Sequence, residues 1–452
     1  MVFSSAIFLF AFLPAVFLLD RLGRDLRWKN AVLALASLVF YAFGQLYYVP
    51  LFLLSVLINY LAGRLLMGGG RRRAVLTAAV VLNLGLLAVF KYTDFILQNL
   101  GLPPAGIILP IGISFYTFQG LSYVIDCYRD PANGTRSFPK LFLYIAFFPQ
   151  LIAGPIVKYH DIAAQIDARV CDPVRTEQGM RRFILGLAKK LLVADTVGYI
   201  ADTVFNGGTG DIRLAWLGAI CYTLQIYYDF SGYSDMAIGM GHMFGFQIRE
   251  NFLHPYGART IRDFWRRWHV SLSSWFREYL YIPLGGNRKG KRRAALNRFL
   301  VFLCTGIWHG ANWTFVVWGL GHGLLSDLEG LGLIPVDKLE KSRVGRLLCR
   351  VYTLLCVTLL FVVFRAESLT AAGAMFAALF AGTVTPTGTI LLHRLLDPVS
   401  GLILLLAAFF SLGIRRRPLP LPLSRVLSLG LLVLSILCLS RGGFHPFIYF
   451  QF

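Results

Sequence analysis

Long uncharged apolar stretches, separated by short basic clusters, constrain this chain of 452 residues more than any other feature. Roughly ten of them approach the length of about 20 apolar residues that one crossing of a lipid bilayer requires. The mean hydropathy is +0.63 and 56% of the residues are hydrophobic, which does not fit a soluble domain. Backbone groups inside lipid must pair within their own segment. We therefore expect an all-α, polytopic integral membrane protein with about 10–12 transmembrane helices plus re-entrant and interfacial helices.

The basic clusters indicate how the chain is oriented. Arg21–Lys29 and Arg64–Arg73 enclose two apolar segments, so both clusters lie on one face of the membrane. The positive-inside rule assigns that face to the cytoplasm. Later clusters, at 287–298 and at Arg415–Arg417, account for much of the remaining net charge of +21. A nucleic-acid partner is not expected, because no soluble basic domain is present to bind one.

The domain organisation is predicted to be simple. We find no internal repeat, so residues 1–452 are expected to form one membrane-embedded domain with its catalytic core at about 110–325. The stretch at 147–160 is apolar but short and rich in proline and glycine, which predicts a broken or re-entrant helix. The seven cysteines form no CxxC pair and no HExxH motif occurs, so neither disulfides nor a metal are expected.

One apolar run carries unusual side chains. Between Phe299 and Ser326 the only titratable groups are Cys304, His309 and His322, and an ionisable group at membrane depth is by default a functional-site hypothesis. His309, in TGIWHGANW, has two interpretations. It is either a packed histidine bonded to a backbone carbonyl or a neutral imidazole acting as a general base. The residues alone leave both open.

The same run is predicted to be a single span at about 299–325. On a straight helix Asn312 then lies one turn beyond His309. His322 follows His309 by thirteen residues, which at about 100° per residue places the two on different faces. A metal shared by the two histidines is therefore not expected.

A basic and aromatic segment precedes this run. His269, in FWRRWHVSLS, is close in sequence to Arg259, Arg262, Arg266 and Arg267. It is either an interfacial histidine or a neutral histidine that donates or accepts a hydrogen bond. The basic segment NRKGKRRAALNR at 287–298 is predicted to form a hairpin. These cations either bind anionic lipid headgroups or bind a phosphate-rich cytosolic ligand.

Three aspartates in the preceding segments also have two interpretations. Asp195, Asp229 and Asp235 are either members of a proton relay, as in a transporter, or partners of nearby Arg and Lys side chains. We favour the second.

Taken together, the motifs resemble the membrane-bound O-acyltransferase family, in particular its alginate O-acetyltransferase branch. The matching stretches run nearly from end to end: MVFSSAIFLFAFLP, LPIGISFYTFQGLSYVIDCYR, FFPQLIAGPIVKY, YYDFSGYSDMAIGMG, FWRRWHVSLSSWFREYLYIPLGGNR, TGIWHGANWTFVVWGLGHG and PFIYFQF. The combination of RWHxSLS with WHG is highly specific.

The resemblance implies a function and a set of site residues. His309 matches the family's catalytic histidine and His269 its second active-site histidine. We expect a pocket lined by Trp308, Asn312, His322 and Trp265, and donor binding by Arg262, Arg266 and Arg267. The implied donor is cytosolic acetyl-CoA.

The resemblance also implies an acceptor and a location. The acceptor is an exopolysaccharide such as alginate, modified with a periplasmic or extracellular acetyltransferase partner. The chain would lie in the bacterial cytoplasmic (inner) membrane and contact its lipids. Cellulose or peptidoglycan as acceptor, or a transporter without catalysis, are the alternatives.

Overall fold

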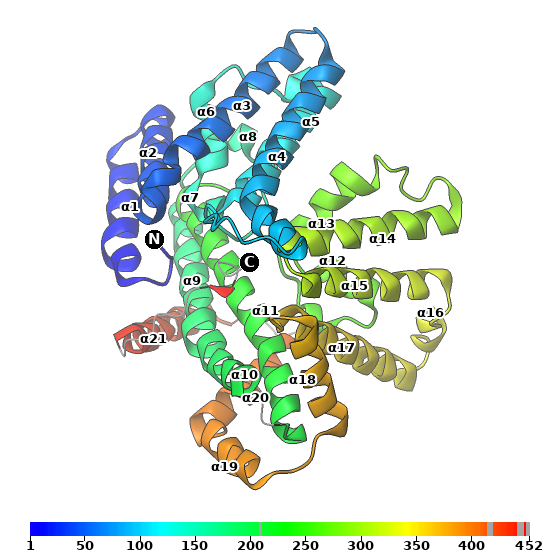
Figure 1. Cartoon of the computed structure of the whole chain (residues 1–452). Helices are drawn as coiled ribbons and strands as arrows, with labels where there is room; N and C mark the ends of the chain where they lie inside the picture. The colour runs from blue at the N-terminus through cyan, green and yellow to red at the C-terminus, as the bar shows by residue number, and fades with distance from the viewer. Residues whose placement is uncertain (208–209, 414–418, 441–446, 449–452) are drawn as a thin grey trace. The chain divides into compact units, whose positions relative to one another are not determined.

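The computed structural model describes residues 1–207, 210–413, 419–440 and 447–448. All the regular elements in these ranges are helices (Figure 1). The β structure in the described residues is limited to one isolated bridge, between Asp211 and Thr383. The cluster Arg415–Arg417 and most of the terminal PFIYFQF motif lie outside the described residues. The expected all-α fold is confirmed.

The chain divides into two compact units, which are described separately. The first comprises Met1–Leu187 and Tyr233–Glu250. Its helices are η1 (Phe8–Phe12), α1 (Leu13–Leu22), α2 (Leu26–Gln45), η2 (Leu46–Tyr48), α3 (Val49–Met67), α4 (Arg72–Asn99), α5 (Ile113–Arg129), η3 (Pro131–Asn133), α6 (Phe138–Ala146), α7 (Phe148–Leu151), α8 (Tyr159–Ala168), most of α9 (Pro173–Ala188) and the last residues of α11 (Ile212–Met243). Within it α3, α4 and α5 lie side by side.

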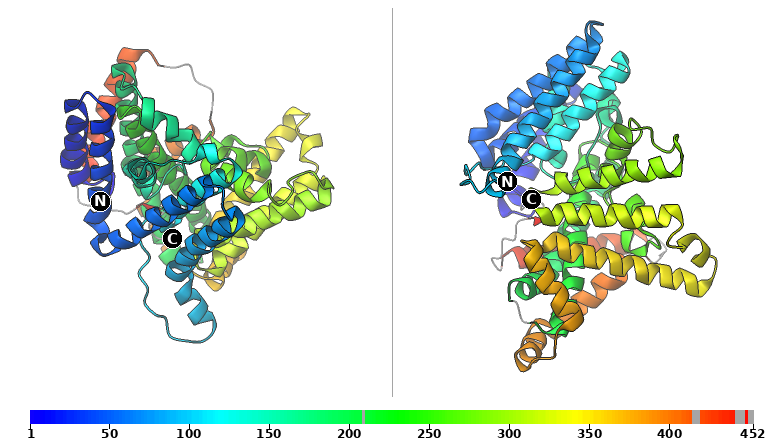
Figure 2. Two further views of the ribbon diagram at one scale, coloured as in Figure 1. Left: turned by 90° about the horizontal axis from the view of Figure 1, so that it is seen from above. Right: turned by 45° about the vertical axis from the view of Figure 1, so that its right-hand side comes forward.

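The second unit comprises Ala188–Gly232 and Asn251–Phe452 and holds the histidines of interest. Its helices are η4 (Lys189–Ala194), α10 (Asp195–Gly207), the first part of α11, η5 (Pro255–Gly257), α12 (Ile261–Arg267), α13 (Val270–Phe276), η6 (Arg277–Tyr281), α14 (Gly290–His309), α15 (Trp313–Leu331), α16 (Val336–Leu339), α17 (Arg343–Arg365), α18 (Leu369–Ala381), α19 (Pro386–Leu395), α20 (Pro398–Ser411) and α21 (Leu421–Ser440). Helices α14, α15 and α17 pack in that order (Figure 2).

Four segments of the described chain are by themselves long and apolar enough to cross a membrane: Leu26–Met67, α4, α17 and α21. A fifth results if α19 and α20, which meet at 76°, form one broken span. Of the remaining helices, α11 is a continuous helix of 32 residues, whereas others are shorter or adjoin π-helical segments, such as η4 between α9 and α10. The stretch at 147–160 is broken as predicted, with only the four-residue α7 before α8 begins.

The predicted single span at 299–325 is wrong, and a second apolar stretch, at 370–392, is likewise two helices. The stretch 299–325 is a hairpin, because α14 ends at His309 and α15 begins at Trp313. The stretch 370–392 contains α18 and α19, separated where Pro386 starts the second helix. Proline has no backbone N–H to continue a helix but fits its first turn, so Pro386 starts α19. At the hairpin, Asn312 is the N-cap of α15, so a new helix begins after α14 has ended.

The basic hairpin expected at 287–298 is also wrong. Gly290 begins α14, so Lys291, Arg292 and Arg293 lie in its first turn.

Asp195, Asp229 and Asp235 pair with nearby cations, which is the interpretation that we favoured over a proton relay. Buried Lys190 lies 2.8 Å from a carboxylate oxygen of Asp195 and of Asp229, and Arg182 lies 2.6 Å from Asp235 in the first unit.

Candidate active site

The α14–α15 hairpin positions His309. Its two helices approach closely because Gly306 and Gly319 face each other, and a Cβ added to Gly319 would lie 2.5 Å from the backbone oxygen of Phe302. Small residues allow such an approach between apolar helices. His309 is the last residue of α14 and is buried. The hairpin therefore places this imidazole at the turn between two tightly packed helices.

The turn itself is held by Asn312. Its side-chain oxygen accepts a hydrogen bond from the backbone N–H of Thr314 at 3.1 Å, which caps α15. Its amide nitrogen donates to the backbone oxygen of Glu367 at 2.8 Å, on the segment that follows α17. Asn312 thus fixes the turn after His309 and does not lie one helical turn further along the same helix, as the sequence had predicted.

Aromatic rings enclose His309. The ring centroids of Trp308, Trp318 and Phe364 lie 4.9, 5.0 and 5.2 Å from that of the imidazole. Each ring plane is steeply inclined to the imidazole, at 67°, 90° and 80°. His309 therefore sits in an apolar box built from three helical segments: α14, α15 and the end of α17.

His322 lies against the same box. Its ring centroid is 5.1 Å from that of Trp318, which also contacts His309. The predicted placement of the two histidines on different faces of one helix is wrong, because it assumed one straight helix and the chain reverses between them. Trp265 of α12 donates its Nε1–H to Nδ1 of His322 at 3.2 Å.

That hydrogen bond fixes the tautomer of His322. The indole N–H is only a donor, so Nδ1 of His322 accepts and the proton of the neutral ring is on Nε2. Neither this Nε2 nor Nε1 of Trp318 has a hydrogen-bond partner among the described residues, although both atoms are buried. Unsatisfied buried donors are costly, and Trp318, which carries one of the two, contacts both His309 and His322.

His269 also lies near Trp308, with ring centroids 6.3 Å apart. It is fully buried and has a left-handed backbone, with φ 44° and ψ 55°, where α13 begins. Such a conformation is uncommon for a residue other than glycine and is costly to maintain. The strain lets the chain turn sharply between α12 and α13 while His269 points into the core.

The side-chain amide of Asn251 sets the tautomer of His269. Oδ1 of Asn251 accepts from the backbone N–H and the hydroxyl of Ser271, at 3.1 and 2.9 Å, and lies 3.2 Å from Nδ1 of His269. Because that oxygen only accepts, Nδ1 must donate, and Nε2 carries the lone pair. Burial lowers the pKa of His269 to about 3, so the ring is neutral near neutral pH.

The structure therefore brings five of the six predicted histidine and pocket residues into one aromatic row. In order of contact the row runs His269, Trp308, His309, Trp318, His322 and Trp265. Trp318 was overlooked as a site residue although it lies within the matching stretch TGIWHGANWTFVVWGLGHG. Asn251 and Phe364 carry no sequence signal, since each joins the site only through tertiary packing.

The three arginines predicted to bind the donor lie on α12. Arg262 pairs with Glu329 at 3.4 Å and with Asp337 at 3.0 Å, and Arg267 pairs with Asp263 at 3.0 Å. Arg266 is exposed. Their helix connects them to the aromatic row, because Trp265 on the same helix contacts His322.

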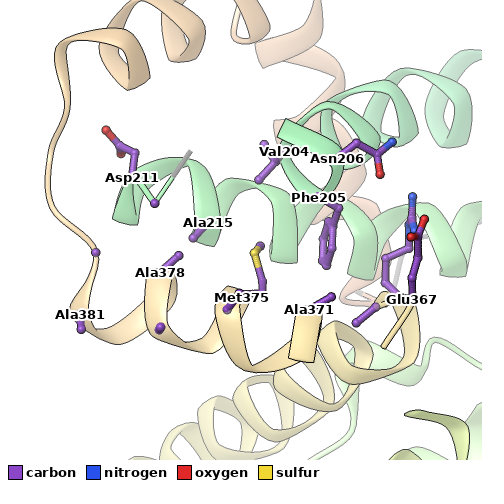
Figure 3. A pocket seen from close by; sticks show the side chains of 16 residues that line it. Val204, Phe205, Asn206, Asp211, Ala215, Glu367, Ala371, Met375, Ala378 and Ala381 are labelled. Atoms are coloured by element: carbon purple, nitrogen blue, oxygen red, sulfur yellow. The ribbon is translucent and has the colours of Figure 1, made fainter. Parts of the chain in front are cut away.

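A cavity of about 830 Å³ lies beside the end of α17 and is lined by α10, α11 and α18 (Figure 3). The wall that α18 contributes is made of alanines and Met375. Asp211 and Ala381 lie at one end of the cavity and Glu367 at the opposite end. Glu367 is the residue whose backbone oxygen accepts from Asn312. No group of three or more His, Cys, Asp or Glu side chains suited to a metal ion occurs within the described ranges.

Comparison with known proteins gives the family. Residues 46–370 match the family model of the membrane-bound O-acyltransferase (MBOAT) family. The chain is 40% identical to the probable alginate O-acetylase AlgI of Pseudomonas putida, with 100% of each chain covered. It is 44% identical to its Pseudomonas aeruginosa counterpart, over 84% of this chain and 75% of the relative.

A third relative carries a different name. The chain is 36% identical to the peptidoglycan O-acetyltransferase of Helicobacter pylori, over 82% of this chain and 78% of the relative. The family match covers well over half of the chain. The chain therefore belongs to the membrane-bound O-acyltransferase family and is a multi-pass membrane acyltransferase.

Proposed function

We propose that this acyltransferase moves acetyl groups from a cytosolic thioester donor, acetyl-CoA, across the inner membrane for O-acetylation of an exopolysaccharide such as alginate. The observation that supports this most is the burial of His309 among Trp308, Trp318 and Phe364 in a chain whose full-length relatives are named alginate O-acetylases. A periplasmic or extracellular acetyltransferase partner would pass the acetyl group to the polymer.

His309 is the general base of the proposed reaction. It takes the proton of the acceptor hydroxyl as the oxygen attacks the thioester carbonyl. The carbon–sulfur bond then breaks, and the departing thiolate takes the proton back from the imidazolium. No proton is gained or lost overall, and the apolar box keeps water, a competing nucleophile, away from the thioester.

Two N–H groups in the row are suited to the carbonyl oxygen. The Nε1–H of Trp318 and the Nε2–H of His322 are buried donors with no acceptor among the described residues, and Trp318 contacts both histidines. Donors held in place before the reaction stabilise negative charge as it develops on oxygen. We assign them to this role, while Trp265 holds His322 in the tautomer that it requires.

His269 orients a reactant. Its Nδ1–H is held by Asn251, so its Nε2 can accept a hydrogen bond but cannot donate one while the ring is neutral. An acceptor beside Trp308 is suited to hold a hydroxyl group with its oxygen turned towards the carbonyl carbon. Trp308 and Asn312 shape this pocket, the second by fixing the turn after His309.

A cell-based comparison tests the proposal. In a host whose own copy of the gene is deleted, His309→Ala is expected to abolish O-acetylation of the secreted polymer while the protein still reaches the membrane. The matched control is His393→Ala, an exposed histidine of α19, which should restore acetylation. Full acetylation with His309→Ala would refute the catalytic role of His309.

The same strains identify the acceptor. The relative named for peptidoglycan makes that polymer the second candidate. Acetyl ester should therefore be measured on both the exopolysaccharide and the peptidoglycan. Loss of ester from peptidoglycan alone would correct the acceptor and leave the reaction unchanged.

A further inference from the structure

A basic cavity of about 680 Å³ lies in the first unit, where α3 ends, α4 begins and α5 ends. The three helices pack side by side (Figure 1). Four of the seven residues that line the cavity are arginines, and the lining includes no carboxylate. These arginines are Arg71, Arg72, Arg73 and Arg129. Such a cavity is suited to an anion, because the planar fork of arginine matches the oxygens of phosphate.

Arg72 is held in the wall of this cavity. Its Nη2 donates to the backbone oxygen of Cys127 at 3.3 Å and to that of Tyr128. Its guanidinium carbon lies 5.4 Å from the ring centroid of Tyr128. Nε of the same side chain is buried and has no hydrogen-bond partner among the described residues. A buried donor without an acceptor is costly, so a ligand that supplies an oxygen to this guanidinium is favoured.

The neighbouring arginines add charge that the protein does not neutralise. Arg71 and Arg73 are exposed. Across the described ranges no ion pair forms at Arg71, Arg72 or Arg73, whereas Arg129 lies 3.6 Å from Asp126. Arg72 and Arg73 also begin the 28-residue helix α4, where the helix dipole is positive. Three positive charges therefore meet at one cavity without a counter-charge.

The surroundings of the cavity indicate the class of anion. Only 17% of the most apolar part of α4 is buried inside the protein, so most of this helix is open to the bilayer. Val81 and Leu82 are exposed and lie about 14 Å along α4 from Arg72. An anion bound at the arginines is thus next to a surface that acyl chains can cover. A molecule with a phosphate at one end and hydrocarbon at the other fits both features.

The charges of the three helices place the cavity at the cytoplasmic surface. Basic residues gather at this end, and Arg64 in the last turn of α3 is one of them. The stretch 95–115, which joins α4 to α5 at their other ends, contains no charged residue. The positive-inside rule assigns the basic end to the cytoplasm, and the leaflet on that side carries anionic lipids.

We propose that this cavity binds the headgroup of an anionic phospholipid of the cytoplasmic leaflet, with the acyl chains lying against α4. Three guanidinium groups without a counter-charge exceed the single charge of one phosphodiester. A lipid with two phosphodiesters, cardiolipin, therefore matches the site best. The site belongs to the first unit and His309 to the second, and lipid binding requires neither a thioester nor an acceptor.

Lipid binding to the purified full chain tests the proposal. Native mass spectrometry in dodecyl maltoside counts the lipids bound as cardiolipin is added. The parent is expected to bind one cardiolipin more tightly than any further copies. Arg71→Ala combined with Arg73→Ala should weaken that first binding at least tenfold. Arg72→Lys should fall in between, because it keeps the charge and loses the fork.

The matched control is Arg24→Ala combined with Arg27→Ala. Both arginines are exposed, lie in the other basic cluster assigned to the cytoplasmic face and do not line the cavity. This variant has the same net charge as the test variant and should bind cardiolipin as the parent does. Equal weakening in the two double variants would assign the attraction to general surface charge and overturn the proposal. Unchanged binding in both would overturn it as well.

Thermal unfolding distinguishes a lipid from a soluble phosphate, because a ligand that binds only the folded state raises the unfolding temperature. The parent should be stabilised most by cardiolipin, less by phosphatidylglycerol, and not by phosphatidylcholine or inorganic phosphate. The variant without Arg71 and Arg73 should unfold as the parent does in the absence of lipid and lose most of the rise with cardiolipin. An equal rise with inorganic phosphate would assign the cavity to a soluble anion and refute the lipid site.

Discussion

At the scale of single residues, the candidate site is defined by the hydrogen bonds of its neighbours. Trp265 makes Nδ1 of His322 an acceptor, and Asn251 makes Nδ1 of His269 a donor. The two histidines therefore present opposite groups to the aromatic row: an N–H from His322 and a lone pair from His269. A pocket with both kinds of group is suited to bind a carbonyl and a hydroxyl together.

Removing one N–H tests the proposed stabilisation of the carbonyl oxygen. Trp318→Phe keeps a ring between His309 and His322 and deletes the indole donor. We expect kcat to fall about 10²-fold with little change in KM, as is typical when one donor to a developing oxyanion is lost. Steady-state release of CoA by the purified chain measures both constants. A rise in KM alone would show that Trp318 serves ground-state binding.

The buried neutral state of His269 predicts a dependence of stability on pH. In the unfolded chain this histidine takes up a proton near its ordinary pKa of 6.5, whereas the folded state resists protonation until about pH 3. The unfolded state thus binds more protons between these values, and stability falls as the pH falls through that window. His269→Gln should flatten this part of the curve of unfolding temperature against pH.

A matched variant controls for general acid effects in that experiment. His393→Gln changes an exposed histidine of α19 and is expected to leave the slope as in the parent. The assignment is contradicted if His269→Gln and the parent lose stability equally over this range.

At the scale of elements, the α14–α15 hairpin depends on close contact between two glycines. A methyl group at Gly319 would meet the backbone of Phe302, and one at Gly306 would meet the backbone oxygen of Phe315. Backbone atoms cannot move aside as a flexible side chain can. The helices would have to separate just before the turn that carries His309.

Gly319→Ala is therefore expected to destabilise the protein by about 1–3 kcal/mol, the usual cost of overpacking, and to lower activity by displacing the imidazole. Gly373→Ala on α18 is the control, because nothing lies within 4 Å of a Cβ added there. Unfolding temperature and CoA release measure the two effects. Normal stability and activity for Gly319→Ala would contradict the close packing.

The same hairpin shows what the sequence can predict and what it cannot. Apolar residues continue without interruption from Phe299 to Ser326, so hydropathy alone indicates one span. The reversal depends on Gly310 and on the cap made by Asn312, signals that a continuous apolar pattern obscures. The motifs identified His309, His269, Trp308, His322 and Trp265, but their order along the row follows from the reversal and was not predictable.

Other site residues were beyond sequence reasoning for a different reason. Phe364 contacts His309 from α17, more than fifty positions further along the chain, and nothing in its local pattern marks it.

At the scale of the whole molecule, the proposed reaction requires one protein to serve two sides of a membrane. The described spans and the family match make it a multi-pass acyltransferase. In the proposed reaction α17 links the two sides, because its first half carries Arg343, Arg346 and Arg350 and its end contacts His309. The cavity at the end of α17 that contains Glu367 (Figure 3) then lies on the acceptor side.

The most direct test of this account is the rate of CoA release from acetyl-CoA by the purified chain, supplied with the acetyltransferase partner that the proposal requires, before and after His309→Ala. The account predicts release by the parent chain and a loss of at least 10³-fold in the variant, with CoA binding retained. Release at the parent rate by the His309→Ala chain would contradict the account.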